Sequence, residues 1–172
     1  HRKGEAASLH NLGNIANTRG DLAEAERLQR ESLAIHRKFG DRKGVADSLI
    51  NIGFLARRRG ALAEAKRMGQ ESLTITKKIG YRKSEAEALG LIGSIAQERG
   101  ELAKAKRLQK RRLTIVREIG YRKAEAEAQF ELGNIAHDNG KMKEYHRCYT
   151  ECVRIRREIG IPIDQWFIDN GY

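Results

Sequence analysis

The sequence contains few of the residues that cross-link or interrupt a small protein. Its 172 residues include only two cysteines, Cys148 and Cys152, too few for a disulfide framework. This cysteine usage favours a reducing compartment, and we expect a cytoplasmic protein. No stretch of about 18 apolar residues is present, so the sequence predicts no membrane span. Aromatic residues make up only 6%, which leaves few rings to stack on the bases of a single-stranded nucleic acid.

Glycine is the one chain-breaking residue that is abundant, with 17 copies against a single proline. The glycines are periodic rather than scattered. Three series each advance by 40 residues: Gly20, Gly60, Gly100 and Gly140; Gly40, Gly80, Gly120 and Gly160; and Gly13, Gly53, Gly93 and Gly133. A fixed period of this size is typical of a protein built from tandem repeats, in which each unit buries its apolar face against the next.

Each repeat has the pattern of two helices, expected in the first repeat at residues 4–19 and 21–39. Apolar residues of the first segment recur every three or four positions: Leu9, Leu12, Ile15 and Ala16. Gly20 is expected to end this helix in the left-handed conformation of a C-terminal cap. Asp21 with Glu24, and Ser84 with Glu87 in the third repeat, have the spacing of a capping box at a helix start. Gly13 is small enough to let a neighbouring helix approach closely.

We therefore expect an all-α fold, a solenoid of four helix-turn-helix repeats at residues 1–40, 41–80, 81–120 and 121–160. Residues 161–172 are expected to form a cap, in which Trp166, Phe167 and Ile168 cover the open end of the fourth repeat. The N-terminal end has no comparable cap and the chain begins with His1, so we expect a fragment of a longer protein.

The pattern Leu12-Gly13, Ala16, Gly20 and Ala25 resembles the signature of the tetratricopeptide repeat family, and the resemblance covers residues 4–160. The 40-residue period is similar to that of repeats in G-protein regulators, kinesin light chains and the sensor arms of STAND signalling ATPases. Alanine stands where the family usually has an aromatic residue late in the first helix. The resemblance implies a right-handed superhelix with a concave groove, lined by the first helices, for a protein or peptide partner.

Matched position by position, the resemblance places one set of residues in this groove: His10, Asn14, Asn17, Ile50, Phe54, Arg57, Arg58, Glu87, Ser94, Gln97, Phe130, Asn134 and His137. Phe54 and Phe130 are expected to anchor a partner, since buried aromatic residues dominate binding energy. The alternative is that both rings pack against neighbouring helices. Asn14 and Asn134 likewise bind either a partner's backbone or an adjacent helix.

The carboxylate clamp of chaperone-binding members of the family is not expected. Two of its later slots, which need cations, hold Glu87 and Leu91. Because Glu87 would repel a terminal carboxylate, the partner is expected to be of another kind.

The formal net charge is +11, and residues 101–119 carry seven cations against two anions. A candidate basic patch lies on this second helix of the third repeat: Lys106, Arg107, Lys110, Arg111 and Arg112. Such a patch either is an ordinary solvated face or binds nucleic acid by neutralising phosphates. A third alternative function is self-association, or a spacer role, through the uncapped N-terminal end.

No catalytic, cofactor-binding or metal-binding motif is recognisable. Cys148 and Cys152 lie one helical turn apart with His146 nearby, whereas a structural metal site needs four ligands. By register Cys152 occupies the position of Ser32 and Ser72, so we expect buried thiols. The sequence thus predicts a non-enzymatic scaffold or sensor module that binds a protein or peptide without a cofactor.

Overall fold

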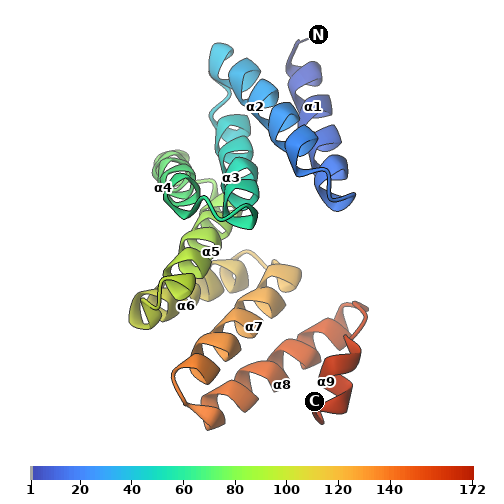
Figure 1. Ribbon diagram of the computed structural model, residues 1–172, viewed down its shortest axis with the longest axis vertical. Coiled ribbons are helices and arrows are strands. Elements are labelled where there is room, and N and C mark those ends of the chain that lie inside the picture. Colours follow the sequence, from blue (N-terminus) through green and yellow to red (C-terminus); the bar gives the residue numbers. More distant parts are fainter. Residues whose placement is uncertain (1) are drawn as a thin grey trace. The chain divides into compact units, whose positions relative to one another are not determined.

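The computed structural model describes residues 2–172, and every regular element in that range is a helix. Figure 1 shows the long helices as successive hairpins, followed by one short helix. They are α1 (Arg2–Thr18), α2 (Leu22–Lys38), α3 (Arg42–Arg58), α4 (Leu62–Ile79), α5 (Arg82–Glu98), α6 (Leu102–Glu118), α7 (Arg122–Asp138), α8 (Met142–Glu158) and α9 (Gln165–Asp169). The predicted all-α class and the helix pair of each repeat are confirmed.

The helices end at glycines in the left-handed conformation. Gly20 has a φ of 83° and Gly80 a φ of 68°, values that a residue with a Cβ resists. At the start of α2 the Asp21 carboxylate accepts a hydrogen bond of 3.0 Å from the Glu24 backbone N–H, as the sequence predicts. The cap predicted at Ser84 is wrong. Because α5 begins at Arg82, Ser84 lies in its first turn, and its hydroxyl donates to Asp47 of α3.

The described chain forms two compact units that divide between Ile95 and Ala96, the N-terminal unit and the C-terminal unit. In the N-terminal unit, α2 and α4 both pack against α3. Leu33 of α2, Leu49 of α3 and Met68 of α4 meet there in one buried cluster. One hairpin alone could not enclose these side chains, so each repeat depends on the next for its core.

The C-terminal unit repeats this arrangement, with α7 packed against both α6 and α8. Its end is covered by α9, which contributes Phe167 to a buried cluster with Tyr149 and Val153. Of the three residues expected to cover this end, only Phe167 is buried, at 2% exposed. Trp166 and Ile168 are about half exposed.

The glycine in the middle of the first helix of a repeat lies very close to a side chain of another helix. A Cβ on Gly53 would lie 2.5 Å from Leu91 Cδ2, and one on Gly133 would lie 2.3 Å from Tyr149 Cε1. Both distances are too short for any real Cβ contact, so only glycine fits these helices without a shift. A close approach is present at these glycines, but it is made chiefly by a side chain and not by the backbone of the neighbouring helix.

The first helix of the chain keeps part of its apolar stripe exposed. Leu12 and Ile15 are 51% and 48% exposed, although Ile52 and Leu55, one repeat later, are buried. Ile52 belongs to the cluster that includes Leu33 of the preceding repeat. Within residues 2–172, α1 has no preceding repeat to supply such a side chain.

Across the described range of the chain, no helix combines the length and the apolar character needed to cross a membrane. In the same range no group of three or more His, Cys, Asp or Glu side chains is placed to hold a metal ion. Cys148 and Cys152 are both buried free thiols, as expected. Burial raises the pKa of Cys152 to about 11, so its thiolate is scarce at neutral pH.

We predict that Gly133→Ala destabilises the chain by about 1–3 kcal/mol, because the new methyl group must displace the Tyr149 ring. Urea unfolding followed by circular dichroism measures the loss. The control is Gly4→Ala in α1, where a Cβ meets nothing within 4 Å. Equal stability of Gly133→Ala and the unchanged chain would contradict the tight packing.

Candidate partner-binding site

The N-terminal unit brings polar side chains of the first two repeats together on α1 and α3. Asn51 of α3 donates through its Nδ2 to Asn14 Oδ1 of α1, at 2.9 Å, and lies 3.4 Å from His10 Nε2. Further along both helices, the Arg58 guanidinium donates to the Asn17 side chain. Asn17 and Arg58, both predicted for the groove, are therefore in contact, whereas His10 and Asn14 contact Asn51, which the predicted set does not include.

A second-helix residue reaches this surface across Gly13. Gln29 of α2 is only 1% exposed, and its amide lies 2.8 Å from where a Cβ of Gly13 would be. Its Nε2 donates to the His10 carbonyl and to Asn14 Oδ1, each at 3.0 Å. Gln29 thereby fixes the orientation of Asn14. Gln29 was not among the groove residues predicted from the sequence, although its register opposite the glycine could have indicated it.

These hydrogen bonds leave one donor group and two acceptor groups without a partner, and one of the acceptors, Gln29 Oε1, is buried. Asn14 Oδ1 accepts from both Gln29 and Asn51, so both of its lone pairs are used. The Nδ2 of Asn14 and the Oδ1 of Asn51 have no partner among the described residues. A hollow of about 100 Å³ lies beside them, the α1–α3 hollow, lined by Gly13, Asn14, Asn17, Gln29, Asn51, Phe54 and Leu55. Its size admits a small side chain or part of a backbone.

His10 and Asp47 give this surface a coupled pair of titratable groups. Burial lowers the pKa of His10 below 6.5, and the nearby Asp47 carboxylate partly offsets that effect. Burial raises the pKa of Asp47, against the opposing effect of hydrogen bonds donated by Ser84 and Tyr81. His10 is therefore mainly neutral at pH 7, and the imidazole can accept or donate one hydrogen bond.

The remaining groove residues of the N-terminal unit differ in accessibility. Phe54 is partly buried and packs against a cluster that includes Ala56 and Leu91, while it also lines the α1–α3 hollow. Ile50 is 1% exposed and belongs to the core, so the prediction that it lines the groove is wrong. The resemblance could not detect this, because it fixes the helix position and not the neighbours. Glu87, Ser94 and Arg57 are partly exposed.

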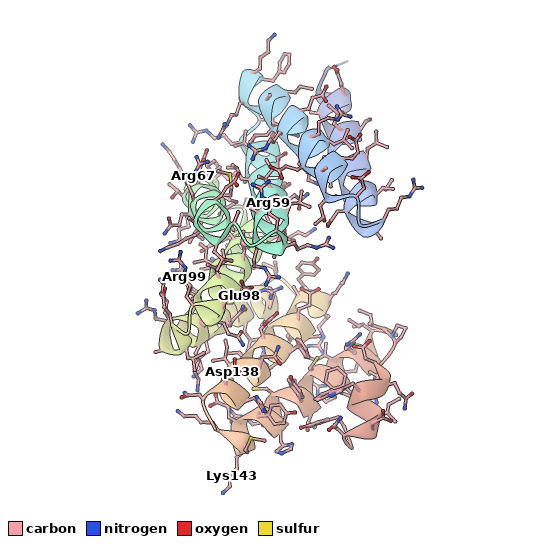
Figure 2. The ribbon with its side chains drawn as sticks, viewed as in Figure 1. Arg59, Arg67, Glu98, Arg99, Asp138 and Lys143 are labelled. Atoms are coloured by element: carbon pink, nitrogen blue, oxygen red, sulfur yellow. The ribbon has the colours of Figure 1, made fainter. Side chains whose placement is uncertain are left out.

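In the C-terminal unit the corresponding residues are engaged within the chain. The Tyr149 hydroxyl donates to Asn134 Oδ1, and the Phe130 ring stacks on Tyr149 with centroids 5.4 Å apart. Gln97 donates to Asp138 at 2.8 Å, and Figure 2 places Asp138 near the end of α7. His137 lies against the Tyr145 ring, with centroids 5.3 Å apart. Phe130 and Asn134 therefore contact a neighbouring helix, which is the alternative to partner binding that the sequence left open.

The five cations of the candidate basic patch differ in exposure and in pairing. Arg112 is buried and donates to Glu127 of α7 at 2.7 Å, and Lys106 pairs with Glu144 of α8 at the same distance. Arg107, Lys110 and Arg111 are exposed. These five cations therefore do not form one continuous surface for phosphates.

An ion network that the sequence analysis did not identify joins the outer helices of the first two repeats. Arg30 of α2 lies 2.7 Å from both Glu26 and Glu64, and Arg59 pairs with the same two carboxylates. Figure 2 shows Arg59 at the end of α3. Because these groups are partly exposed, the network adds little stability, about 0–1 kcal/mol per pair.

A sequence model of the tetratricopeptide repeat family matches residues 4–78. No curated protein sequence matches the chain significantly. The resemblance to the tetratricopeptide repeat family is thus confirmed over the first two repeats, where the α1–α3 hollow lies.

Solved structures show the same fold over nearly the whole chain. Aspartyl phosphate phosphatase F of Bacillus subtilis is similar over 93% of this chain, with a TM-score of 0.83 and 12% identity. RapI in its apo form is similar over 91% of this chain, with a TM-score of 0.80 and 14% identity. A Podosopora anserina structure described as a kinesin light chain with nearly identical TPR-like repeats is similar over 92% of this chain, with a TM-score of 0.72 and 19% identity. At these identities the likeness establishes the fold alone. The chain spans 42%, 57% and 77% of the length of these three proteins.

We predict that Asp47→Asn lowers the pKa of His10 further, because it removes the carboxylate that favours the imidazolium. The NMR titration of the His10 ring measures this shift. In the unchanged chain the midpoint should already lie below 6.5. Since the unfolded state binds this proton more readily, the stability from neutral His10 is full above pH 6.5 and decreases as pH falls through the folded pKa. An unchanged or raised midpoint in Asp47→Asn would contradict the coupling.

Proposed function

We propose that this chain is a protein-interaction module that binds an extended segment of a partner protein over the α1–α3 hollow. The single observation that carries the proposal is the available pair of groups there, Asn14 Nδ2 as donor and Asn51 Oδ1 as acceptor. One peptide unit offers the matching carbonyl oxygen and N–H. An extended segment has these groups free, whereas a helix uses them internally.

Two further features support a peptide ligand. Phe54 lines the hollow beside the amide pair and offers an apolar surface to a partner side chain. Gln29 donates a hydrogen bond to Asn14 and fixes its orientation, so the Asn14 side chain loses little conformational freedom when a peptide binds.

We further propose that the module works without a catalytic step or cofactor, as a scaffold or sensor in cytoplasmic signalling. The tetratricopeptide resemblance and the fold of the kinesin light chain structure support this role. One structural relative is named a phosphatase, and that name belongs to a protein of which this chain spans 42%.

The test uses peptides selected from a random library displayed on phage, with fluorescence anisotropy to measure their affinity. We predict that the double variant Asn14→Ala, Asn51→Ala weakens binding about tenfold or more, because two hydrogen bonds of about 0.5–1.5 kcal/mol each are lost. The matched control is Asn11→Ala, an exposed asparagine on the same helix with no hydrogen bond among the described residues. The idea is wrong if the double variant binds as the unchanged chain does, or if Asn11→Ala costs as much.

Self-association is a second candidate function, favoured by the exposed Leu12 and Ile15 on α1. A second copy could cover these side chains with its own α1. We predict that the mass measured by light scattering rises with concentration toward a dimer, and that Leu12→Glu, Ile15→Glu keeps the chain monomeric. A chain that is monomeric at every concentration would exclude this function. Nucleic-acid binding is not favoured, because Lys106 and Arg112 of the basic patch are already paired with carboxylates.

A further inference from the structure

A cavity of about 530 Å³ opens in the C-terminal unit, among α6, α7 and α8. We call it the outer pocket. It is lined by Lys110, Leu113, Arg117, Gln129, Leu132, Glu144, Arg147, Cys148, Thr150 and Glu151. This volume lies within the range of about 300–1,000 Å³ that is usual for small-molecule sites. None of these residues belongs to the α1–α3 hollow, so the outer pocket is independent of the proposed peptide site.

The repeat register explains why the cavity is here. Gln129 and Cys148 correspond to Leu49 and Met68, two repeats earlier. In the N-terminal unit Leu49 and Met68 are packed together in the buried cluster with Leu33 and Ile52. Cysteine is shorter than methionine, and an amide replaces an apolar group at Gln129. The fourth repeat therefore has less side-chain volume, and more polarity, where the second has a filled core.

The Gln129 side chain lines the pocket and has no hydrogen-bond partner among the described residues. It is only 7% exposed, and neither its oxygen nor its nitrogen makes a hydrogen bond to any described residue. The amide atoms themselves are not fully buried and open onto the cavity, so a ligand in the cavity can hydrogen-bond to them. Leu113 and Leu132 add apolar surface to the same cavity.

The charges around the pocket are not balanced. Glu144 is paired with Lys106 at 2.7 Å, Glu151 with Arg154 at 2.6 Å, and Arg117 with Glu125 at 2.8 Å. Lys110 and Arg147 have no ion pair with any described residue, and both line the pocket. Two available cations beside neutralised carboxylates favour an anionic group.

We propose that the outer pocket binds a small organic anion with an apolar body. The body lies against Leu113, Leu132 and the Cys148 thiol. Gln129 hydrogen-bonds to a polar edge of the ligand, and Lys110 and Arg147 bind its carboxylate, phosphate or sulfonate. The ligand class follows from these three features together: an apolar wall, one free amide and two free cations.

The probe is 1-anilinonaphthalene-8-sulfonate, an organic anion whose fluorescence increases in apolar surroundings. The deciding variant is Gln129→Leu, Cys148→Met, which installs the residues that the chain itself uses at positions 49 and 68. We expect saturable binding to the unchanged chain and an affinity at least tenfold lower in this variant. Its melting temperature should not decrease, because the cavity becomes filled.

A second variant tests the charges without changing the core. Lys110→Gln, Arg147→Gln should weaken binding of the probe at least fivefold. The matched control is Lys143→Gln, an exposed cation of α8 that does not line the pocket and is labelled in Figure 2. If the filled variant fails to fold, this pair of variants decides the question alone.

The position of the probe is checked through Cys148. Bound probe should slow alkylation of Cys148 by iodoacetamide, as measured by mass spectrometry of the peptides. The proposal is overturned if the unchanged chain shows no saturable binding, if the folded filled variant binds as well, or if Lys143→Gln weakens binding as much as the Lys110 and Arg147 changes. It is also overturned if bound probe leaves the alkylation of Cys148 unchanged.

Discussion

The close crossing of helices at a glycine of the first, third and seventh helices is the constraint on which the rest of the structure depends. Because Gly13, Gly53 and Gly133 have no Cβ, a side chain of a neighbouring helix can lie directly over the first helix. In the second repeat Leu91 of the next hairpin fills this space, so one repeat is locked to the following one. A side chain in place of the glycine would separate the helices and open the cores that consecutive repeats share.

The same crossing decides which parts of the first helices remain available to a partner. In the first repeat Gln29 crosses Gly13 and occupies only the oxygen of Asn14, which leaves the nitrogen free. In the fourth repeat Tyr149 crosses Gly133, binds Asn134 and stacks on Phe130. Equivalent positions of one repeat pattern thus form the proposed peptide site in the first two repeats and a packed aromatic cluster in the fourth.

Much of the fold could be predicted because it follows from residues that act locally. Gly20 can adopt a positive φ and Asp21 can cap the next helix whatever surrounds them, so helix pairs and turns were evident from the period. Accessibility could not be predicted in the same way. Ile50 and Arg112 are buried by neighbours from other helices, and Ser84 donates to Asp47 rather than capping α5. The role of Gln129 depends on the gap between helices, which no single segment encodes, whereas the register of Gln29 opposite Gly13 is visible in the sequence.

The most direct measurement of the central claim is the two-dimensional NMR spectrum of side-chain amides during titration with a selected peptide. We expect large changes in the Nδ2 resonances of Asn14 and Asn51, because both amides contact the peptide in the proposed complex. The Asn134 resonance should stay unchanged, because Asn134 lies in the C-terminal unit and does not line the α1–α3 hollow. Changes at Asn134 with none at Asn14 and Asn51 would contradict the placement of the peptide site on α1 and α3.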